Sequence, residues 1–265
     1  MSQPSKLDGR VAIVTGAGSS GPGFGTGKAI SVLLAREGAR VVLVDKYEER
    51  AKETLALIEG EGGEATIIIA DLAEIAACQP IADQAVSRFG TVDILVNNAA
   101  IASSTGILDT TPELYQQVLA VNLTAPFMLT KAVIPIMQQA GGGAIVNITS
   151  IAAMRGSGGR GQTAYAAAKA GLTGLMIDVA DSFGKHGIRI NCIAPGIIDT
   201  PMRTQAMLQA GIEPGEIDLS FKTSLGIEGD AWDIARAVLF LAGPDGRYVT
   251  GVQIPVDGGV TARSH

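Results

Sequence analysis

Short apolar runs, most of them rich in β-branched residues, recur along the chain and alternate with longer stretches of helical composition. The runs are nearly continuous in apolar residues, which is typical of strands in a parallel sheet that is covered on both faces. The pattern predicts seven strands, at 11–14, 41–44, 66–69, 94–96, 144–148, 188–193 and 252–256.

The stretches between these runs predict the helices that cover the sheet. We expect helices at 27–37, 48–59, 76–89, 112–140, 164–183 and 230–242, with Pro126 and Pro135 as breaks in the fourth. Because the alternation continues without a linker, the sequence predicts one doubly wound (Rossmann) α/β domain over 1–265. Residues 200–226 lack a clear period, and a long segment of this kind is typical of a substrate lid.

Composition and charge restrict the class of protein. With 47% hydrophobic and 17% charged residues, the chain is expected to fold. A formal net charge of -6 disfavours wide contact with nucleic acid or an anionic membrane, so we expect small-molecule ligands. The N-terminus lacks the apolar core of a signal peptide, and no apolar run reaches the roughly 18 residues that would span a bilayer.

The cysteines and histidines point to a reducing compartment and to no metal. Cys78 and Cys192 form no CxxC pair and lie in apolar surroundings, so we expect reduced thiols and a cytoplasmic protein. The two histidines, His186 and His265, form no ligand cluster, and no metal site is expected.

A glycine-rich loop follows the first predicted strand and leads into the first helix, with six glycines from Gly16 to Gly27. Glycines let the backbone approach phosphate oxygens, and the helix start offers free N–H groups. The alternative is a flexible turn. The loop precedes Asp45, which ends the second strand and is suited to bind an adenosine ribose, so the pair predicts a dinucleotide site.

Two acidic residues indicate which dinucleotide binds. Asp45 would repel a 2′-phosphate and bind a free diol, which favours NAD over NADP, although Lys46 weakens this argument. Its alternative is a polar residue that closes a strand. Asp71 is a candidate for the adenine amino group, with Leu72 against the ring, and its alternative is a helix N-cap.

Tyr165 and Lys169 are four residues apart in a stretch of strong helix formers, so their side chains share one helix face. A nearby ammonium and an oxidised nicotinamide both favour a phenolate, which makes Tyr165 a candidate proton carrier. Ser150, at the end of the fifth strand, is suited to hold a substrate oxygen. The alternatives are an exposed helix face for the pair and a simple cap for Ser150.

From about residue 6 to 260 the chain resembles the short-chain dehydrogenase/reductase family. The resemblance rests on the motifs above together with four more: NNAA from Asn97, VNL around Asn122, PGIIDT from Pro195 and VDGG from Val256. The resemblance implies that Tyr165 is the general acid/base, that Lys169 lowers its pKa and holds the nicotinamide ribose, that Ser150 orients the substrate, and that Asn122 anchors a water leading to Lys169. It implies a cofactor site of Gly16, Gly25, Thr26, Gly27, Asp45, Asp71, Leu72, Asn98, Ala99, Tyr165, Lys169, Ile198 and Thr200.

The chain departs from the family pattern at three places. The glycine loop is about five residues longer, Ala100 replaces a glycine, and the loop between Ser150 and Tyr165 is about two residues longer. The family also implies a homotetramer, assembled through the helices at 112–140 and 164–183 and the C-terminal strand.

The function that we expect is NAD-dependent interconversion of a secondary alcohol and a ketone. The alternatives are a 3-oxoacyl-carrier-protein reductase and a non-catalytic NAD-binding module. Arg155 and Arg160, in the longer loop, predict an anionic substrate, and the alternative is two solvated arginines. The segment 200–226 is expected to add a third positive charge at Arg203 and apolar contacts from Met202, Met207, Leu208 and Phe221.

Overall fold

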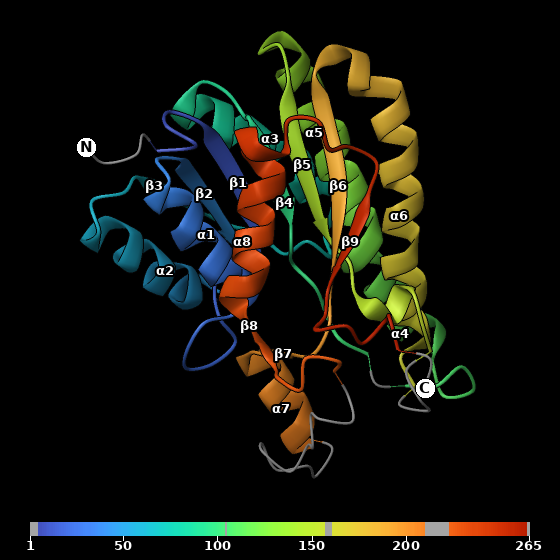
Figure 1. The fold of residues 1–265 in the computed structure, drawn as a ribbon. Coiled ribbons are helices and arrows are strands. Elements are labelled where there is room, and N and C mark those ends of the chain that lie inside the picture. Colours follow the sequence, from blue (N-terminus) through green and yellow to red (C-terminus); the bar gives the residue numbers. More distant parts are fainter. Residues whose placement is uncertain (1–4, 104, 157–160, 210–222, 264–265) are drawn as a thin grey trace.

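The computed structural model describes residues 5–103, 105–156, 161–209 and 223–263. Its centre is a parallel sheet in the order β3-β2-β1-β4-β5-β6-β9 (Figure 1). The bounds are β1 (Val11–Thr15), β2 (Arg40–Asp45), β3 (Ala65–Ile69), β4 (Ile94–Asn97), β5 (Gly143–Ile148), β6 (Ile188–Pro195) and β9 (Gln253–Val256). The predicted doubly wound fold and its seven strands are confirmed.

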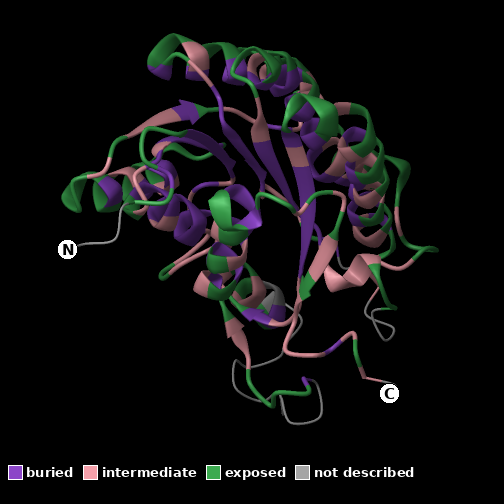
Figure 2. Cartoon of the chain, turned by 45° about the horizontal axis from the view of Figure 1, so that its top comes forward, coloured by how far each residue is buried: buried purple, intermediate pink, exposed green. Residues whose placement is uncertain are grey.

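Helices cover both faces of this sheet, because its central strands are apolar on both sides. On β1, Ala12 and Val14 face one apolar cluster and Val11 and Ile13 face the other. The first cluster includes residues of α1 (Thr26–Arg36), α2 (Glu48–Gly60) and α8 (Ala231–Ala242), and the second includes α3 (Cys78–Phe89), α5 (Ala125–Gln139) and α6 (Thr163–Phe183). Figure 2 shows the buried strands between helices whose outer sides are exposed.

The fourth predicted helix is one continuous helical stretch, and neither proline breaks it. α4 (Pro112–Leu119) leads through a π-helical turn (Ala120–Thr124) into α5. Pro126 lies in the first turn of α5, directly after the π-helical turn, and Pro135 lies inside a helix that core packing maintains. By length and composition Pro112–Gln139 could cross a membrane, but half of its most apolar window is buried inside the protein.

The segment after β6 is more regular than the sequence predicts. β7 (Ile198–Asp199) pairs with β8 (Gly229–Asp230), and α7 (Pro201–Gln209) begins directly after β7. The expectation of no period over 200–226 is therefore wrong at its start, and residues 210–222 lie outside the described residues. Short 3-10 helices are η1 (Ile75–Ala77), η3 (Ile151–Ala153), η4 (Gly184–His186) and η5 (Pro244–Gly246).

Candidate active site

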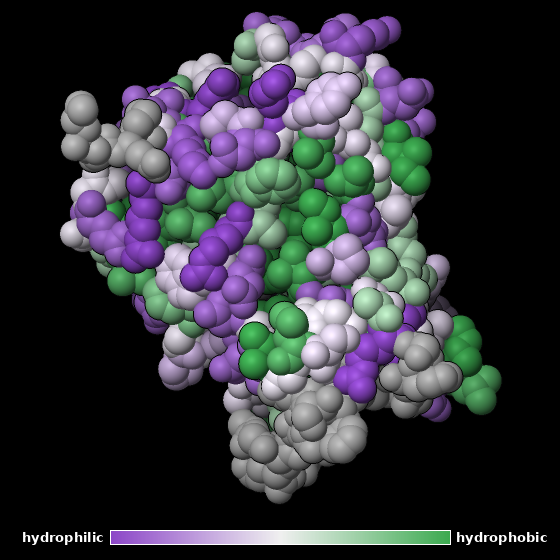
Figure 3. Space-filling model, in the orientation of Figure 1, coloured by the Kyte–Doolittle hydropathy of each residue, from purple (hydrophilic) through white to green (hydrophobic). Residues whose placement is uncertain are grey.

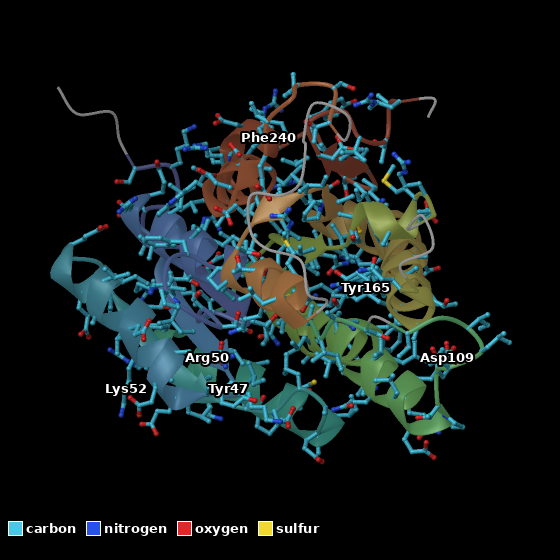
Figure 4. All side chains as sticks on the ribbon, turned by 90° about the horizontal axis from the view of Figure 1, so that it is seen from below. Tyr47, Arg50, Lys52, Asp109, Tyr165 and Phe240 are labelled. Carbon is cyan, nitrogen blue, oxygen red and sulfur yellow. The ribbon has the colours of Figure 1, made fainter. Side chains whose placement is uncertain are left out.

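A pocket of about 1480 Å³ opens where the parallel strands end. It lies at the point where the strand order reverses, between β1 and β4, which is the usual ligand site of such sheets. One end is lined by residues that follow β2 and β3, and the other by Ser150, Tyr165 and α7. In Figure 4, α7 lies between the side that carries Tyr47 and Arg50 and the side that carries Tyr165.

The glycine loop forms a cradle that a side chain would fill. Gly16 has a φ of 62°, and a Cβ on Gly27 would lie 1.9 Å from the Gly16 carbonyl oxygen. Gly25 is the N-cap of α1 and supplies no side-chain acceptor, so the first N–H groups of that helix remain for a ligand. The loop therefore fits the diphosphate of a dinucleotide.

The additional loop residues are held by Ser19, which the sequence analysis did not single out. Its Oγ accepts a hydrogen bond from the Gly25 N–H at 3.2 Å and donates to the Gly21 carbonyl oxygen at 2.9 Å. Of residues 18–24, Gly18, Ser19 and Ser20 line the pocket. Gln205 on α7 donates from Nε2 to the Ser20 carbonyl oxygen at 2.8 Å, so α7 touches the loop directly.

The two acidic residues lie together at the adenosine end. Asp45 is buried and accepts backbone N–H bonds from Gly18 at 2.9 Å and from Tyr47 at 3.0 Å. Lys46 pairs with Asp71 at 2.7 Å, and this contact, followed by the Ala73 N–H, lowers the pKa of the Asp71 carboxyl. Lys46 is therefore paired with a carboxylate, which reduces the attraction that its charge would exert on a 2′-phosphate beside Asp45.

A cation that the sequence analysis missed also lines this end. The Arg50 guanidinium lies 4.1 Å from the centre of the Tyr47 ring, and both residues line the pocket (Figure 4). In the sequence, Tyr47 and Arg50 are marked only by their position shortly after β2. A stacked guanidinium at this point lies near the expected ribose and is available to an adenine ring or a phosphate.

Asn98 is oriented toward the glycine loop. Its Nδ2 donates to the carbonyl oxygens of Thr15 at 2.9 Å and Gly16 at 3.1 Å, while the Thr15 hydroxyl accepts the N–H groups of Asn98 and Ala99. Asn98 also lines the pocket. Its contact with a cofactor ribose stays a prediction. The bonds that the structure contains make it a residue that positions the loop.

Ser150, Tyr165 and Lys169 meet in the pocket. Ser150 is the N-cap of η3, accepting the Ala152 N–H at 3.1 Å, and lines the pocket together with Tyr165. Lys169 is 2% exposed, donates from Nζ to the Ile148 carbonyl oxygen at 2.7 Å, and has Nζ 5.7 Å from the centre of the Tyr165 ring. Ser150 is thus both a cap and a pocket group.

Burial determines the pKa values of this group. It raises the pKa of the Tyr165 phenol above its ordinary value, while the nearby Ser150 hydroxyl acts in the opposite direction. Burial also lowers the pKa of Lys169 to about 8, opposed by nearby Cys192. Lys169 is not among the causes of the shift at Tyr165, so its role in lowering the pKa of Tyr165 stays a prediction. A cationic nicotinamide would favour the phenolate.

Of the other predicted residues, Asn122 does not line the pocket. Asn122 is fully buried, donates to the Ile101 carbonyl oxygen at 2.9 Å and accepts the Ile101 N–H at 3.2 Å. The water link to Lys169 stays a prediction. The remaining predicted cofactor residues line the pocket: Gly16, Gly25, Thr26, Gly27, Asp45, Asp71, Leu72, Ala99, Ile198 and Thr200.

The substrate end differs in part from the prediction. Arg203 forms an ion pair with Glu228, so its charge is neutralised. Met202 and Met207 line the pocket, and Leu208 does not.

Arg155 lines the pocket and donates to the Val260 carbonyl oxygen at 2.6 Å. Arg263, which the sequence analysis missed, also lines it. The expectations for Arg160 and Phe221 fall outside the described part of the chain.

Cys78 and Cys192 are buried free thiols, and burial raises the pKa of each, that of Cys192 to about 12. Within the described residues no group of three or more His, Cys, Asp or Glu side chains is arranged to hold a metal ion.

Comparison with known proteins assigns the chain to a family. The family described as enoyl-(acyl carrier protein) reductase matches residues 22–261. An uncharacterized short-chain type dehydrogenase/reductase of Sinorhizobium fredii is 38% identical, covering 96% of this chain and 98% of its own. The crystal structure of a putative short-chain dehydrogenase/reductase from Burkholderia xenovorans is 39% identical, with a TM-score of 0.91 over 98% of this chain and 100% of its own.

Other relatives bear on the cofactor and on the alternative function. Carveol dehydrogenase from Mycobacterium avium, solved in complex with NAD, is 30% identical with a TM-score of 0.88, covering 98% of this chain and 100% of its own. A putative gluconate 5-dehydrogenase from Beutenbergia cavernae, with bound NADP, is 32% identical with a TM-score of 0.87, covering 98% of this chain and 100% of its own. A 3-oxoacyl-[acyl-carrier-protein] reductase of Thermotoga maritima is 34% identical, covering 96% of this chain and 99% of its own.

Proposed function

The chain belongs to the short-chain dehydrogenase/reductase family, and we propose that its pocket is the active site in which Tyr165 transfers the proton of a secondary alcohol. The protein is an NAD(P)-dependent oxidoreductase that interconverts alcohol and ketone groups. The observation that carries the proposal is that Ser150, Tyr165 and Lys169 line the same pocket as the open N-terminus of α1.

The chain's own residues position the reactants and transfer the proton. When bound, the nicotinamide supplies the site that accepts or donates hydride. Ser150 holds the substrate oxygen beside Tyr165, whose phenolic oxygen takes the alcohol proton during oxidation and returns it during reduction. Lys169, fixed on the Ile148 carbonyl, is placed to hold the nicotinamide ribose, and Asn122 to anchor the proposed water behind it.

The cofactor residues are assigned along the pocket. The diphosphate binds at Gly16, Gly25, Thr26 and Gly27 and the ribose at Asp45. The adenine binds at Asp71 and Leu72, and the nicotinamide half at Asn98, Ala99, Ile198 and Thr200. We infer a preference for NAD over NADP, because Asp45 is a buried carboxylate and the neighbouring Lys46 is paired with Asp71.

Two alternatives have weaker support. A 3-oxoacyl-carrier-protein reductase usually uses NADP, which Asp45 opposes. A non-catalytic NAD-binding module would have no use for Ser150, Tyr165 and Lys169 together in one pocket.

Assembly and domain organisation complete the proposal. Exposed Phe127 on α5, Ile177 on α6 and Val252 before β9 support a homotetramer assembled through these elements. Figure 3 shows hydrophobic side chains gathered between α8 and α6. We also propose one catalytic domain, a lid that begins with α7, a small-molecule substrate that carries an anionic group, and a cytoplasmic location.

The test is a screen of the purified protein for NAD and NADP reduction with secondary alcohols, diols, polyols and hydroxy acids. We expect turnover of at least one class, faster with NAD. The proposal fails if the protein binds NAD and turns over none of these alcohols, since a non-catalytic module would behave in that way.

A further inference from the structure

The charges of the pocket are distributed unevenly between its two ends. Among the described residues, two carboxylates line the pocket, and both lie at the adenosine end: Asp45 ends β2 and Asp71 follows β3. The charged side chains that line the pocket at the other end are cations only: Lys169, Arg155, Arg203 and Arg263.

These cations are not equally available to a ligand. Lys169 is bound to the Ile148 carbonyl beneath the reaction site, and Arg203 is neutralised by Glu228. Arg155 differs, because its described partner is the neutral carbonyl of Val260, and no described carboxylate forms an ion pair with it. Its positive charge is therefore uncompensated by the described residues and adjoins the pocket.

Arg155 is held in place from two sides of the molecule. It follows η3, whose N-cap is Ser150, so only this short turn and Met154 separate it from Ser150 along the chain. Its Nη1 donates at 2.6 Å to Val260, a buried residue of the C-terminal segment, and Figure 1 shows this segment reaching the edge of the sheet where α6 begins. A fixed guanidinium loses less conformational entropy when it binds a ligand than a free one does.

We infer that Arg155 forms a subsite for an anionic group of the substrate, such as the carboxylate of a hydroxy acid or oxo acid. This inference rests on the proposed function and specifies its substrate class. A guanidinium that keeps N–H groups free beside one anchoring bond can donate a charge-assisted pair to a carboxylate. Arg263, on the C-terminal segment, also lines this end of the pocket.

The first test compares each 2-hydroxy and 3-hydroxy acid of four to six carbons with its primary amide, in wild type, Arg155→Gln and Arg155→Lys. Wild type should prefer the acids. Arg155→Gln, which retains a donor for the Val260 carbonyl, should raise KM for the acids about tenfold and change KM for the amides less than twofold. Arg155→Lys should recover part of the loss, because it restores the charge without the fork.

Arg236→Gln is the matched control, since this arginine lies on the exposed side of α8, pairs with Asp233 and does not line the pocket. It should behave as wild type. Equal losses for acids and amides in Arg155→Gln would mean that Arg155 only anchors the C-terminal segment, and would overturn the inference. Turnover of neutral alcohols with no acid preference would also overturn it, together with the anionic substrate proposed above, while leaving the proposed proton transfer by Tyr165 intact.

A binding measurement gives an answer that does not depend on turnover. Butyrate and butyramide are titrated into the protein–NADH complex, followed by NADH fluorescence. Butyrate should bind more tightly than butyramide to wild type and lose about tenfold in affinity in Arg155→Gln, which corresponds to about 1.4 kcal/mol. Equal binding of the two ligands to wild type would overturn the inference even if no substrate had been found.

Discussion

Lys169 combines a functional position with an energetic cost to the protein. Its ammonium lies in the interior at 2% exposure, with a carbonyl oxygen as its hydrogen-bond partner, and burial lowers its pKa to about 8. The folded protein therefore holds this proton less tightly than the unfolded chain, whose lysine has a pKa near 10.5. Stability must then depend on pH wherever the two states bind different numbers of protons.

The sign of this dependence gives the first prediction. Between pH 8 and 10.5 the unfolded chain binds more protons at residue 169, so the free energy of unfolding should rise with pH through this window. Relative to Lys169→Met, wild type should gain on the order of 3 kcal/mol across the window. Urea unfolding of both proteins at several pH values measures it. Parallel curves for the two proteins would show that Lys169 is not the responsible group.

Asp45 gives a second prediction at the residue scale. Wild type should prefer NAD to NADP by at least tenfold in kcat/KM, a difference of about 1.4 kcal/mol. Asp45→Asn keeps the size of the side chain and one oxygen acceptor but removes the charge that repels a 2′-phosphate, so the preference should shrink. Initial rates with both cofactors decide this. A wild-type preference for NADP would be evidence against the role of Asp45 and would direct attention to Arg50.

At the scale of elements, the pocket is covered where two segments that are distant in sequence meet. The glycine loop turns outward at Ser20 and Gly21, and α7 approaches so closely that a Cβ on Gly21 would lie 3.2 Å from the Pro201 side chain. Gln205 donates to the Ser20 carbonyl oxygen across this contact. The longer loop and α7 therefore meet beside the proposed diphosphate position.

This contact predicts a kinetic effect on the cofactor. Gln205→Ala removes one neutral hydrogen bond, worth about 0.5–1.5 kcal/mol, so release of NADH should accelerate by about threefold. Stopped-flow displacement of NADH measures the rate. Leu208→Ala is the control, since this residue is exposed on the same helix and does not line the pocket. Equal release rates in wild type and both variants would remove α7 from the cofactor site.

Sequence patterns predicted the elements that a short stretch of the chain is enough to identify. Seven strands and the meeting of Ser150, Tyr165 and Lys169 follow from apolar runs and from the shared edge at which parallel strands end. Arg203 was misjudged because its partner Glu228 is brought near by the pairing of β7 with β8, which no local pattern indicates. Pro135 was misjudged because core packing maintains α5 through it.

At the scale of the whole molecule, the outer surface carries large apolar side chains that one chain leaves exposed. Phe127 is 50% and Ile177 59% exposed, on α5 and α6. Apolar side chains of this size on neighbouring helices are typical of an interface between copies.

This surface predicts the mass of the protein in solution. Light scattering after size exclusion should give four times the chain mass of 27.1 kDa. Phe127→Glu should reduce that mass, whereas Leu57→Glu on α2, outside the proposed interface, should leave it unchanged. A wild-type mass equal to one chain would contradict the proposed tetramer without affecting the chemistry of the pocket.

The central claim is that the Tyr165 hydroxyl transfers the substrate proton, and Tyr165→Phe tests it most directly. General acid/base catalysis contributes about 10²- to 10⁴-fold, so kcat should fall by at least a hundredfold, while the Kd for NAD, measured by calorimetry, should change less than threefold. Tyr248→Phe, at a residue that is 95% exposed, should retain full activity. If Tyr165→Phe kept more than about a tenth of the wild-type kcat, the account would be contradicted.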